Sequence, residues 1–158
     1  MLTFLLSPHG RTSRGGYWAF IGGLFVLTII AIIADESLGT GGFDTGTGLF
    51  EAIVSILAIW PGIAVSVRRF HDRNMTGWWY LILLIAMFVV GIAGAVVGGI
   101  ISGVDFTAME NMSDTQMISV FWPGILGVML VAIYWFFIQL VLPGQQGENK
   151  YGPDPLAK

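Results

Sequence analysis

The sequence predicts an all-α fold, a bundle of four transmembrane helices with both termini on the cytoplasmic side. Hydrophobic residues make up 55% of the chain and charged residues only 11%. The mean hydropathy is +0.79, and the basic residues all fall on one side of a four-span topology. A soluble domain carries roughly 25% charged residues. This chain therefore has too little polar surface for water, which indicates a lipid environment.

Four continuous apolar runs form the expected spans, at residues 17–34, 50–67, 78–101 and 119–142 of one membrane domain over residues 1–158. A helix needs about 20 apolar residues to cross about 30 Å of hydrocarbon. The last two runs are long enough to tilt, whereas the first two need their apolar or aromatic flanks. The runs are continuous rather than alternating, which argues against membrane strands.

The placement of charges predicts the orientation. The seven basic residues lie in segments 1–16, 68–77 and 143–158: Arg11, Arg14, Arg68, Arg69, Arg73, Lys150 and Lys158. The two other loops carry only acidic charges: Asp35, Glu36, Asp44, Glu51, Asp105, Glu110 and Asp114. The positive-inside rule then places the basic segments in the cytoplasm. We expect the acidic loops to be solvated connectors, and a weak cation site there is a much less favoured alternative.

Small residues and prolines mark particular helix faces. Small residues recur every fourth position in two lines, Ala58–Gly62–Ser66 and Gly91–Ala95–Gly99, with Gly94 and Gly98 on a neighbouring line. Such lines allow close helix approach, and packing within the bundle is favoured over a homodimer face. Ser113 and Asp114 are expected to cap the fourth helix. Pro61 should bend the second helix, and Pro123 fits a first-turn position in the fourth.

Apart from Glu51 in the outer flank of the second run, the expected spans contain no Asp, Glu, Lys, Arg or His, although ion-coupled transporters usually place such groups at membrane depth. This argues against ion coupling. A small transporter, channel or exporter with a passive hydrophobic route remains the alternative function. Gln139, near the inner end of the fourth span, is interpreted as an interfacial or interhelical hydrogen-bonding residue.

Three motifs lie in the basic segments: GRTSRGGYWAF at 10–20, VRRFHDRNMTGWWYL at 67–81 and PGQQGENKYGPDP at 143–155. Their order around four apolar runs resembles the domain-of-unknown-function 805 family of small bacterial inner-membrane proteins. The resemblance covers essentially the whole chain, with Thr76 where the family often has serine. It implies an inner-membrane location and this architecture, and it implies no particular activity.

Three interpretations of the motifs compete. The first is structural: Asp72 pairs with Arg11 or Arg14 and ties the first helical hairpin to the second, while Trp18, Trp78 and Trp79 anchor at the interface. The second is binding of anionic lipid headgroups or a protein partner, because arginine offers paired donors to phosphate. Its candidate residues are Arg11, Arg14, Arg68, Arg69, His71, Asp72 and Arg73, with a C-terminal lid carrying Asn149 and Tyr151.

Catalysis or metal binding is the third and least favoured interpretation. The chain has no cysteine and only two histidines, His9 and His71. The adjacent His71 and Asp72 would diverge on a helix, since residues one apart do not face each other. We therefore expect a non-catalytic scaffold or accessory protein without metal or cofactor. Its expected partners are anionic membrane lipids, further copies or a larger membrane complex, and not nucleic acid.

Overall fold

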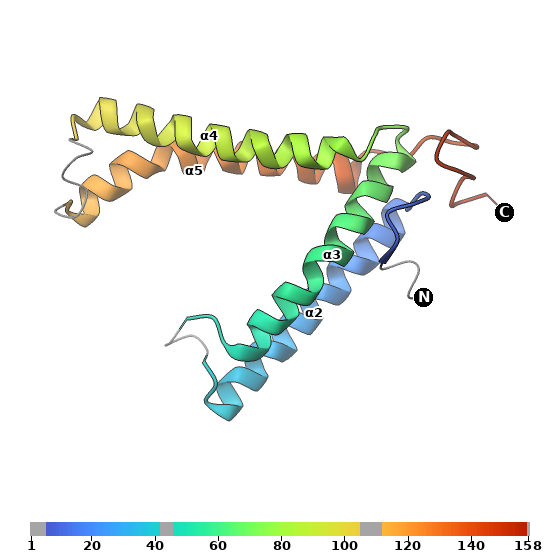
Figure 1. Ribbon diagram of the computed structural model, residues 1–158, viewed down its shortest axis with the longest axis horizontal. Coiled ribbons are helices and arrows are strands. Elements are labelled where there is room, and N and C mark those ends of the chain that lie inside the picture. Colours follow the sequence, from blue (N-terminus) through green and yellow to red (C-terminus); the bar gives the residue numbers. More distant parts are fainter. Residues whose placement is uncertain (1–5, 42–45, 105–111, 158) are drawn as a thin grey trace. The chain divides into compact units, whose positions relative to one another are not determined.

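The computed structural model describes residues 6–41, 46–104 and 112–157, and their regular structure is helical (Figure 1). The helices are α2 (Arg14–Leu38), α3 (Leu49–Asp72), α4 (Trp78–Ser102) and α5 (Asp114–Phe136). A five-residue π-helix, η2 (Phe137–Val141), follows α5 directly. No strand occurs in these residues, and Asn149 and Gly152 form an isolated β-bridge. Each of the four long helices is apolar enough to cross a membrane, which confirms the expected fold class.

The helices extend beyond the predicted apolar runs because their caps lie in the polar flanks. The Ser13 hydroxyl accepts a hydrogen bond from the Gly16 amide at 3.2 Å, so α2 begins at Arg14. Gly39 ends this helix in the left-handed conformation, with φ 65°. At the start of α5, Ser113 and Gln116 form a reciprocal capping box, which confirms Ser113 as the expected cap.

The predicted position of Pro123 in the helix is wrong. The capping box starts α5 at Asp114, so Pro123 lies in the helix interior instead of its first turn. Pro61 likewise lies inside α3. A proline within a helix removes one backbone hydrogen bond, so both positions are expected to weaken the helix locally.

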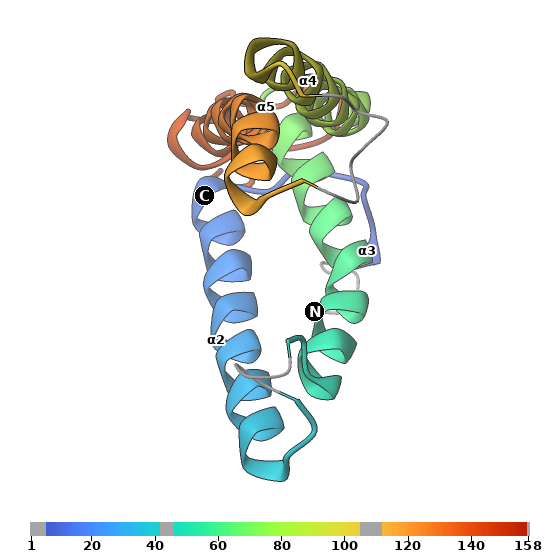
Figure 2. The same cartoon turned by 90° about the vertical axis from the view of Figure 1, so that its left-hand side faces the viewer.

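The described chain divides into two compact units, and each is considered separately. The first combines Met1–Gly77 with Gln139–Lys158, and the second is Trp78–Ile138. In the first, α2 and α3 form an antiparallel pair (Figure 2). One end of this pair is held by Tyr17, which packs on Val65 and shares a 3.3 Å hydrogen bond with the Ser66 hydroxyl.

Asp35 holds the other end of the α2–α3 pair, which corrects its expected place in a solvated loop. Its side chain is completely buried, and its carboxylate accepts the amides of Phe50 and Glu51 at 3.0 and 2.9 Å. The Thr40 hydroxyl donates to the same carboxylate at 2.6 Å. Asp35 therefore caps the positive N-terminal end of α3. Four other charges discussed above, Asp44, Asp105, Glu110 and Lys158, lie outside the described residues.

In the second unit, glycines bring α4 and α5 into close contact. A Cβ atom on Gly124 would lie 2.6 Å from the carbonyl oxygen of Gly91, and one on Gly98 would overlap the carbonyl of Val120. Tyr80 and Trp135 also meet edge to face, with ring centroids 4.9 Å apart. The small residues of α4 thus pack within its own hairpin, as predicted. On α3, by contrast, a Cβ on Gly62 would meet no described atom within 4 Å.

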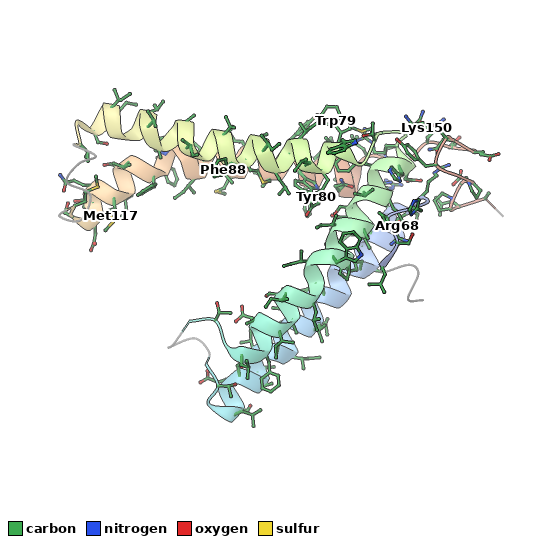
Figure 3. The ribbon with its side chains drawn as sticks, viewed as in Figure 1. Arg68, Trp79, Tyr80, Phe88, Met117 and Lys150 are labelled. Atoms are coloured by element: carbon green, nitrogen blue, oxygen red, sulfur yellow. The ribbon has the colours of Figure 1, made fainter. Side chains whose placement is uncertain are left out.

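Most apolar side chains point away from these helical pairs. In the most apolar stretch of each helix, only 11–17% of residues are buried. Phe88 of α4, for example, is 70% exposed (Figure 3). Apolar surface on this scale greatly exceeds the patches found on soluble monomers. It is the surface expected of helices in contact with lipid, and it fits a multi-pass membrane protein.

Candidate functional site

The basic motifs meet in the first compact unit. The lead-in to α2 supplies Arg11, the last turn of α3 supplies Arg69, His71 and Asp72, and residues 143–155 fold against them. Arg69 and Asp72 are three residues apart and therefore lie on the same face of α3. We call the ion-paired set Arg11, Arg69 and Asp72 the Arg–Asp cluster.

Asp72 is the centre of the Arg–Asp cluster. Its carboxylate accepts a hydrogen bond from Arg11 Nε at 3.1 Å and another from Arg69 Nη1 at 2.5 Å. The side chains of Arg11, Arg69 and Asp72 are 1%, 0% and 4% exposed. The pairing of Arg11 with Asp72 matches the first interpretation of the sequence. Since Arg11 precedes α2 and Asp72 ends α3, this ion pair closes the α2–α3 hairpin. It is not a link between the first and second hairpins.

Backbone carbonyls satisfy the remaining guanidinium donors. Arg11 donates to the carbonyls of Gln145, Gly147 and Gly152, the last two at 2.5 and 3.3 Å. Arg69 donates to the carbonyls of Gln139, at 2.6 Å, and Leu142. A guanidinium carries five N–H donors in a fixed plane, whereas an ammonium has three on a single nitrogen. This geometry explains why both positions are arginine and not lysine.

The C-terminal segment is fastened to the end of α3. The Gln145 amide donates to the Asp72 carbonyl at 2.8 Å, and Asn149 Nδ2 donates to the His71 carbonyl at 2.9 Å. The ring of Tyr151 stacks on that of His71 with centroids 3.8 Å apart and planes within 6°. The His71 ring is also held by the segment before α2, because His71 Nδ1 donates to the Gly10 carbonyl at 3.2 Å. Asn149 and Tyr151 therefore hold the segment closed over α3.

Asp154 shapes the same segment from within. Its carboxylate accepts the amides of Leu156 and Gly147, both at 2.9 Å. These two backbone hydrogen bonds lower the pKa of Asp154 below its ordinary value, because they favour the charged carboxylate. This role was not predicted from the sequence. The pattern Asp154-Pro155-Leu156, with an acidic side chain two residues before the bonded amide, was the available signal for an Asx turn.

The other cations at this end lie outside the Arg–Asp cluster. Arg68 is buried, with Nε donating to the Ala64 carbonyl at 3.4 Å. Arg14 is exposed and donates to the Val141 carbonyl at 3.1 Å. Arg73 is half-buried and contacts Met75 Sδ at 3.6 Å, while Lys150 lies over the Tyr151 ring. The buried guanidiniums of Arg11 and Arg69 share one buried carboxylate, Asp72, so the Arg–Asp cluster carries one excess positive charge.

A polar recess of about 290 Å³ opens beside the Arg–Asp cluster. Ser13, Arg14 and Gly15 line it at the start of α2, and the C-terminal segment lines it with Gly144 and Gln145. Asp72 and Asp154 also reach the recess. Across the described parts of the chain, no three histidine, cysteine or acidic residues gather as metal ligands would.

Three predicted anchors lie outside the Arg–Asp cluster. Trp18 is on α2, and Trp78 and Trp79 begin α4 in the second unit. Their side chains are 49%, 71% and 41% exposed. An interfacial role for them stays a prediction.

Gln139 differs from its interpretation as a side-chain hydrogen-bonding residue. Its side chain is buried, and its amide nitrogen and oxygen have no hydrogen-bond partner among the described residues. Its backbone carbonyl instead accepts Arg69 Nε. Gln139 lies two residues before the end of η2, and the last carbonyls of a helix have no partner within it, so this carbonyl is available to Arg69.

Comparisons with known proteins agree with the resemblance seen in the motifs. The family described as "Protein of unknown function (DUF805)" matches residues 5–153. The chain is 29% identical over 152 residues to "Uncharacterized protein YiiR" of Escherichia coli K12, covering 96% of this chain and 87% of that protein. It is 37% identical over 77 residues to "Inner membrane protein YhaH" of the same strain, covering 49% and 63% respectively. No solved structure matches the chain.

Proposed function

This chain belongs to the DUF805 family of proteins of unknown function, and we propose that it is a non-catalytic scaffold or accessory protein of the inner membrane. Its Arg-rich end would face the cytoplasm and bind anionic lipid headgroups. The printed name of YhaH supports the inner membrane as its location. The confinement of basic residues to the terminal segments and the 68–77 loop supports the orientation.

The observation that carries this proposal is the excess of positive charge around Asp72. Buried charges are normally paired, yet the buried guanidiniums of Arg11 and Arg69 share this one carboxylate. Arg14 adds an exposed guanidinium, and its charge acts on Arg69 together with that of Arg73. A phosphate group would balance this charge and accept paired guanidinium hydrogen bonds. Anionic lipid is the abundant phosphate source beside a cytoplasmic membrane surface.

The cluster also has the character of a binding surface and not of a catalytic centre. His71 and Asp72 turn to different partners, the Gly10 carbonyl and two guanidiniums, so they do not form a general-base pair. Arg11 and Arg69 are fully engaged in holding the chain together. The exposed Arg14 is therefore the group best suited to a ligand, and it lines the recess together with Asp72 and Asp154.

A charge-matched pair of variants tests the headgroup site. Arg14→Gln and Lys150→Gln each remove one positive charge from the same end of the protein, and neither residue belongs to the Arg–Asp cluster. Native mass spectrometry of the purified protein would measure retained phosphatidylglycerol. A basic residue near a membrane contributes about 1 kcal/mol, or roughly fivefold in affinity. The affinity for phosphatidylglycerol should decrease by more than about fivefold in Arg14→Gln and by no more than about fivefold in Lys150→Gln.

Equal retention by wild type and Arg14→Gln would refute the headgroup site. Equal losses in both variants would reduce it to general attraction between a positive surface and anionic lipid. Phosphatidylcholine serves as the lipid control, because it has a phosphate without net negative charge. A stoichiometric second polypeptide in place of lipid would instead identify an accessory subunit.

A further inference from the structure

The segment before α2, residues 6–13, crosses from the start of α2 to α3 and then runs along α3 (Figure 2). Near α2, the Thr12 amide donates to the Arg68 carbonyl at 3.2 Å. At the far end of the segment, the Leu6 carbonyl accepts the indole N–H of Trp60 at 2.8 Å. Arg68 and Trp60 are separated by about 12 Å along the helix axis, at about 1.5 Å per residue. Extended chain from Thr12 to Leu6 reaches about 20 Å, so the segment covers this distance without strain.

Trp60 lies at membrane depth if α3 spans the bilayer. It is near the middle of this helix, which runs from Leu49 to Asp72 and is apolar enough to span. If Trp60 lay at the membrane surface, only residues 49–59 would remain to cross the hydrocarbon, about 17 Å at about 1.5 Å per residue. The hydrocarbon is about 30 Å thick. The Leu6 carbonyl, which is bonded to the Trp60 indole, therefore lies well below the level of the headgroups.

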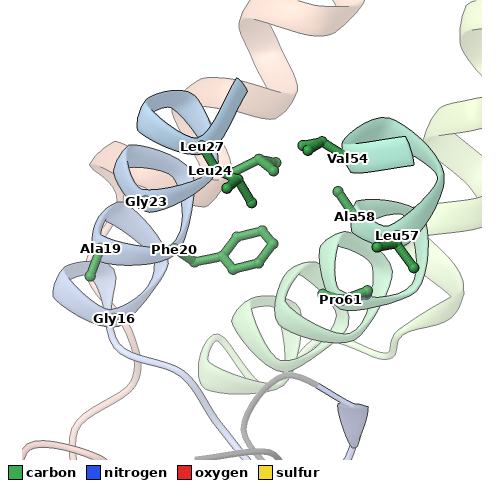
Figure 4. Close-up of a pocket in the computed structure, with 10 residues that line it drawn as sticks. All are labelled: Gly16, Ala19, Phe20, Gly23, Leu24, Leu27, Val54, Leu57, Ala58 and Pro61. Carbon is green, nitrogen blue, oxygen red and sulfur yellow. The ribbon is translucent and has the colours of Figure 1, made fainter. Parts of the chain in front are cut away.

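The segment contacts α3 on a side that faces lipid. The side chains of Ile56 and Ile59 are 67% and 61% exposed, and those of Trp60 and Leu6 are each 51% exposed. Pro61 lines an apolar groove of about 470 Å³ between α2 and α3, whereas Trp60 is not among the described residues that line it (Figure 4). The segment therefore adds to the outer surface of the helical pair and does not lie between the two helices.

The backbone contacts of the segment suit a place in hydrocarbon. Polar backbone groups at membrane depth must find partners within the protein. The Leu6 carbonyl is paired with the Trp60 indole, and this contact also gives the indole N–H an acceptor that lipid cannot supply. Pro8 has no N–H to satisfy. The His9 amide donates to the Ser7 hydroxyl at 3.2 Å.

We propose that residues 6–12 form a short re-entrant anchor, which enters the bilayer beside α3, is held by Trp60 and places Leu6 among the acyl chains. Its partner is the hydrocarbon of the leaflet on the Arg-rich side of the protein. The anchor joins the start of α2 to the middle of α3, so it also fastens the helical pair from outside.

The charges of the sequence agree with this depth, because charged side chains are costly within a membrane. Residues 1–10 contain no Asp, Glu, Lys or Arg, and Arg11 belongs to the Arg–Asp cluster at the end of α3. His9 is the one ionisable side chain in residues 1–10, and it is exposed. The chain between Leu6 and His9 can extend by about 10 Å, which lets the His9 ring return toward the headgroups.

The sequence has no cysteine, so single cysteines can be spin-labelled to measure depth. The labelled positions are Leu6→Cys, Phe25→Cys at an exposed site in the middle of α2, and Glu148→Cys at an exposed site in the C-terminal segment. Collisions of the label with oxygen, which concentrates in hydrocarbon, are compared with collisions with a water-soluble nickel chelate. Leu6→Cys should match Phe25→Cys, with high oxygen and low nickel accessibility. Nickel accessibility equal to that of Glu148→Cys would overturn the anchor.

A second variant tests the contact with α3. Trp60→Phe keeps an aromatic ring but leaves the Leu6 carbonyl without its donor, so nickel accessibility at position 6 should increase by about fivefold or more. Trp122→Phe is the matched control, because Trp122 is also exposed but lies on α5 in the other compact unit. Unchanged nickel accessibility in Trp60→Phe, or an equal increase in Trp122→Phe, would overturn the contact.

Two further controls keep these results interpretable. The label on Phe25→Cys should stay at the same depth in the Trp60→Phe background, which shows that the helical pair still spans the membrane. Vesicles of dioleoylphosphatidylcholine carry no anionic headgroup, so the depth of Leu6 is measured independently of the proposed headgroup site.

Discussion

Replacing Asp72 with asparagine tests the Arg–Asp cluster most directly. The change keeps the shape of the side chain but removes the charge shared by Arg11 and Arg69, at 3.1 and 2.5 Å. Both guanidiniums are buried, and the backbone carbonyls around them carry no net charge. Breaking a buried ion pair by removing one partner costs about 3–5 kcal/mol. For a chain of this size, that cost corresponds to a decrease in Tm of roughly 6–20 °C.

Thermal unfolding of the detergent-solubilised protein would measure this decrease, with Glu148→Gln as the control. Glu148 lies in the same segment but is exposed, so its change from carboxylate to amide should leave Tm nearly unaltered. In Asp72→Asn, the backbone amides of Gln145 and Asn149 should also exchange hydrogen faster, because the anchor of their segment is weakened. A decrease in Tm below about 2–4 °C would match an exposed ion pair and would refute the reasoning from burial.

Three further predictions concern other parts of the chain. Gly98→Ala should destabilise the α4–α5 hairpin by about 1–3 kcal/mol, because the new methyl group meets the Val120 backbone, which cannot rotate away; a denaturation midpoint equal to wild type would contradict this contact. Because the folded-state pKa of Asp154 is lowered, its stabilising effect is present above its ordinary pKa of 3.8 and is lost as pH falls through the folded value. The protection factor of the Gly147 amide against hydrogen exchange should therefore fall on acidification below about pH 4, and Asp154→Asn should remove this pH dependence. A C-terminal fusion after Lys158 should give an active cytoplasmic reporter and an inactive periplasmic one, and the opposite pattern would exclude the proposed orientation.

The four helices could be predicted because each depends on local sequence. Long apolar runs suffice to identify membrane-spanning helices, and Ser113 could be identified as a cap from its position before such a run. The small residues of α4 also predicted close packing correctly. The error at Pro123 arose from taking the apolar run as the start of the helix, whereas the capping box at Ser113 and Gln116 starts α5 earlier.

The roles of Asp35, Asp154 and Gln139 could not be predicted in the same way. An acidic residue in a loop is usually solvated, but Asp35 meets the amides of Phe50 and Glu51 because the α2–α3 turn brings them together. The role of Asp154 similarly depends on a turn of the chain that brings its carboxylate to the Gly147 amide. The carbonyl of Gln139 becomes an acceptor for Arg69 only when residues seventy positions apart are neighbours.

The sequence by itself determined the membrane class, the number of long apolar helices and the family, because hydropathy and motif order are properties of the chain alone. Only the tertiary structure decided what the arginines do. It turned Arg11 and Arg69 inward to Asp72 and to backbone carbonyls, and it left Arg14 exposed at a recess. These residues are alike in sequence, and they differ because the donors of a guanidinium are satisfied by whatever acceptors the folded chain places around it.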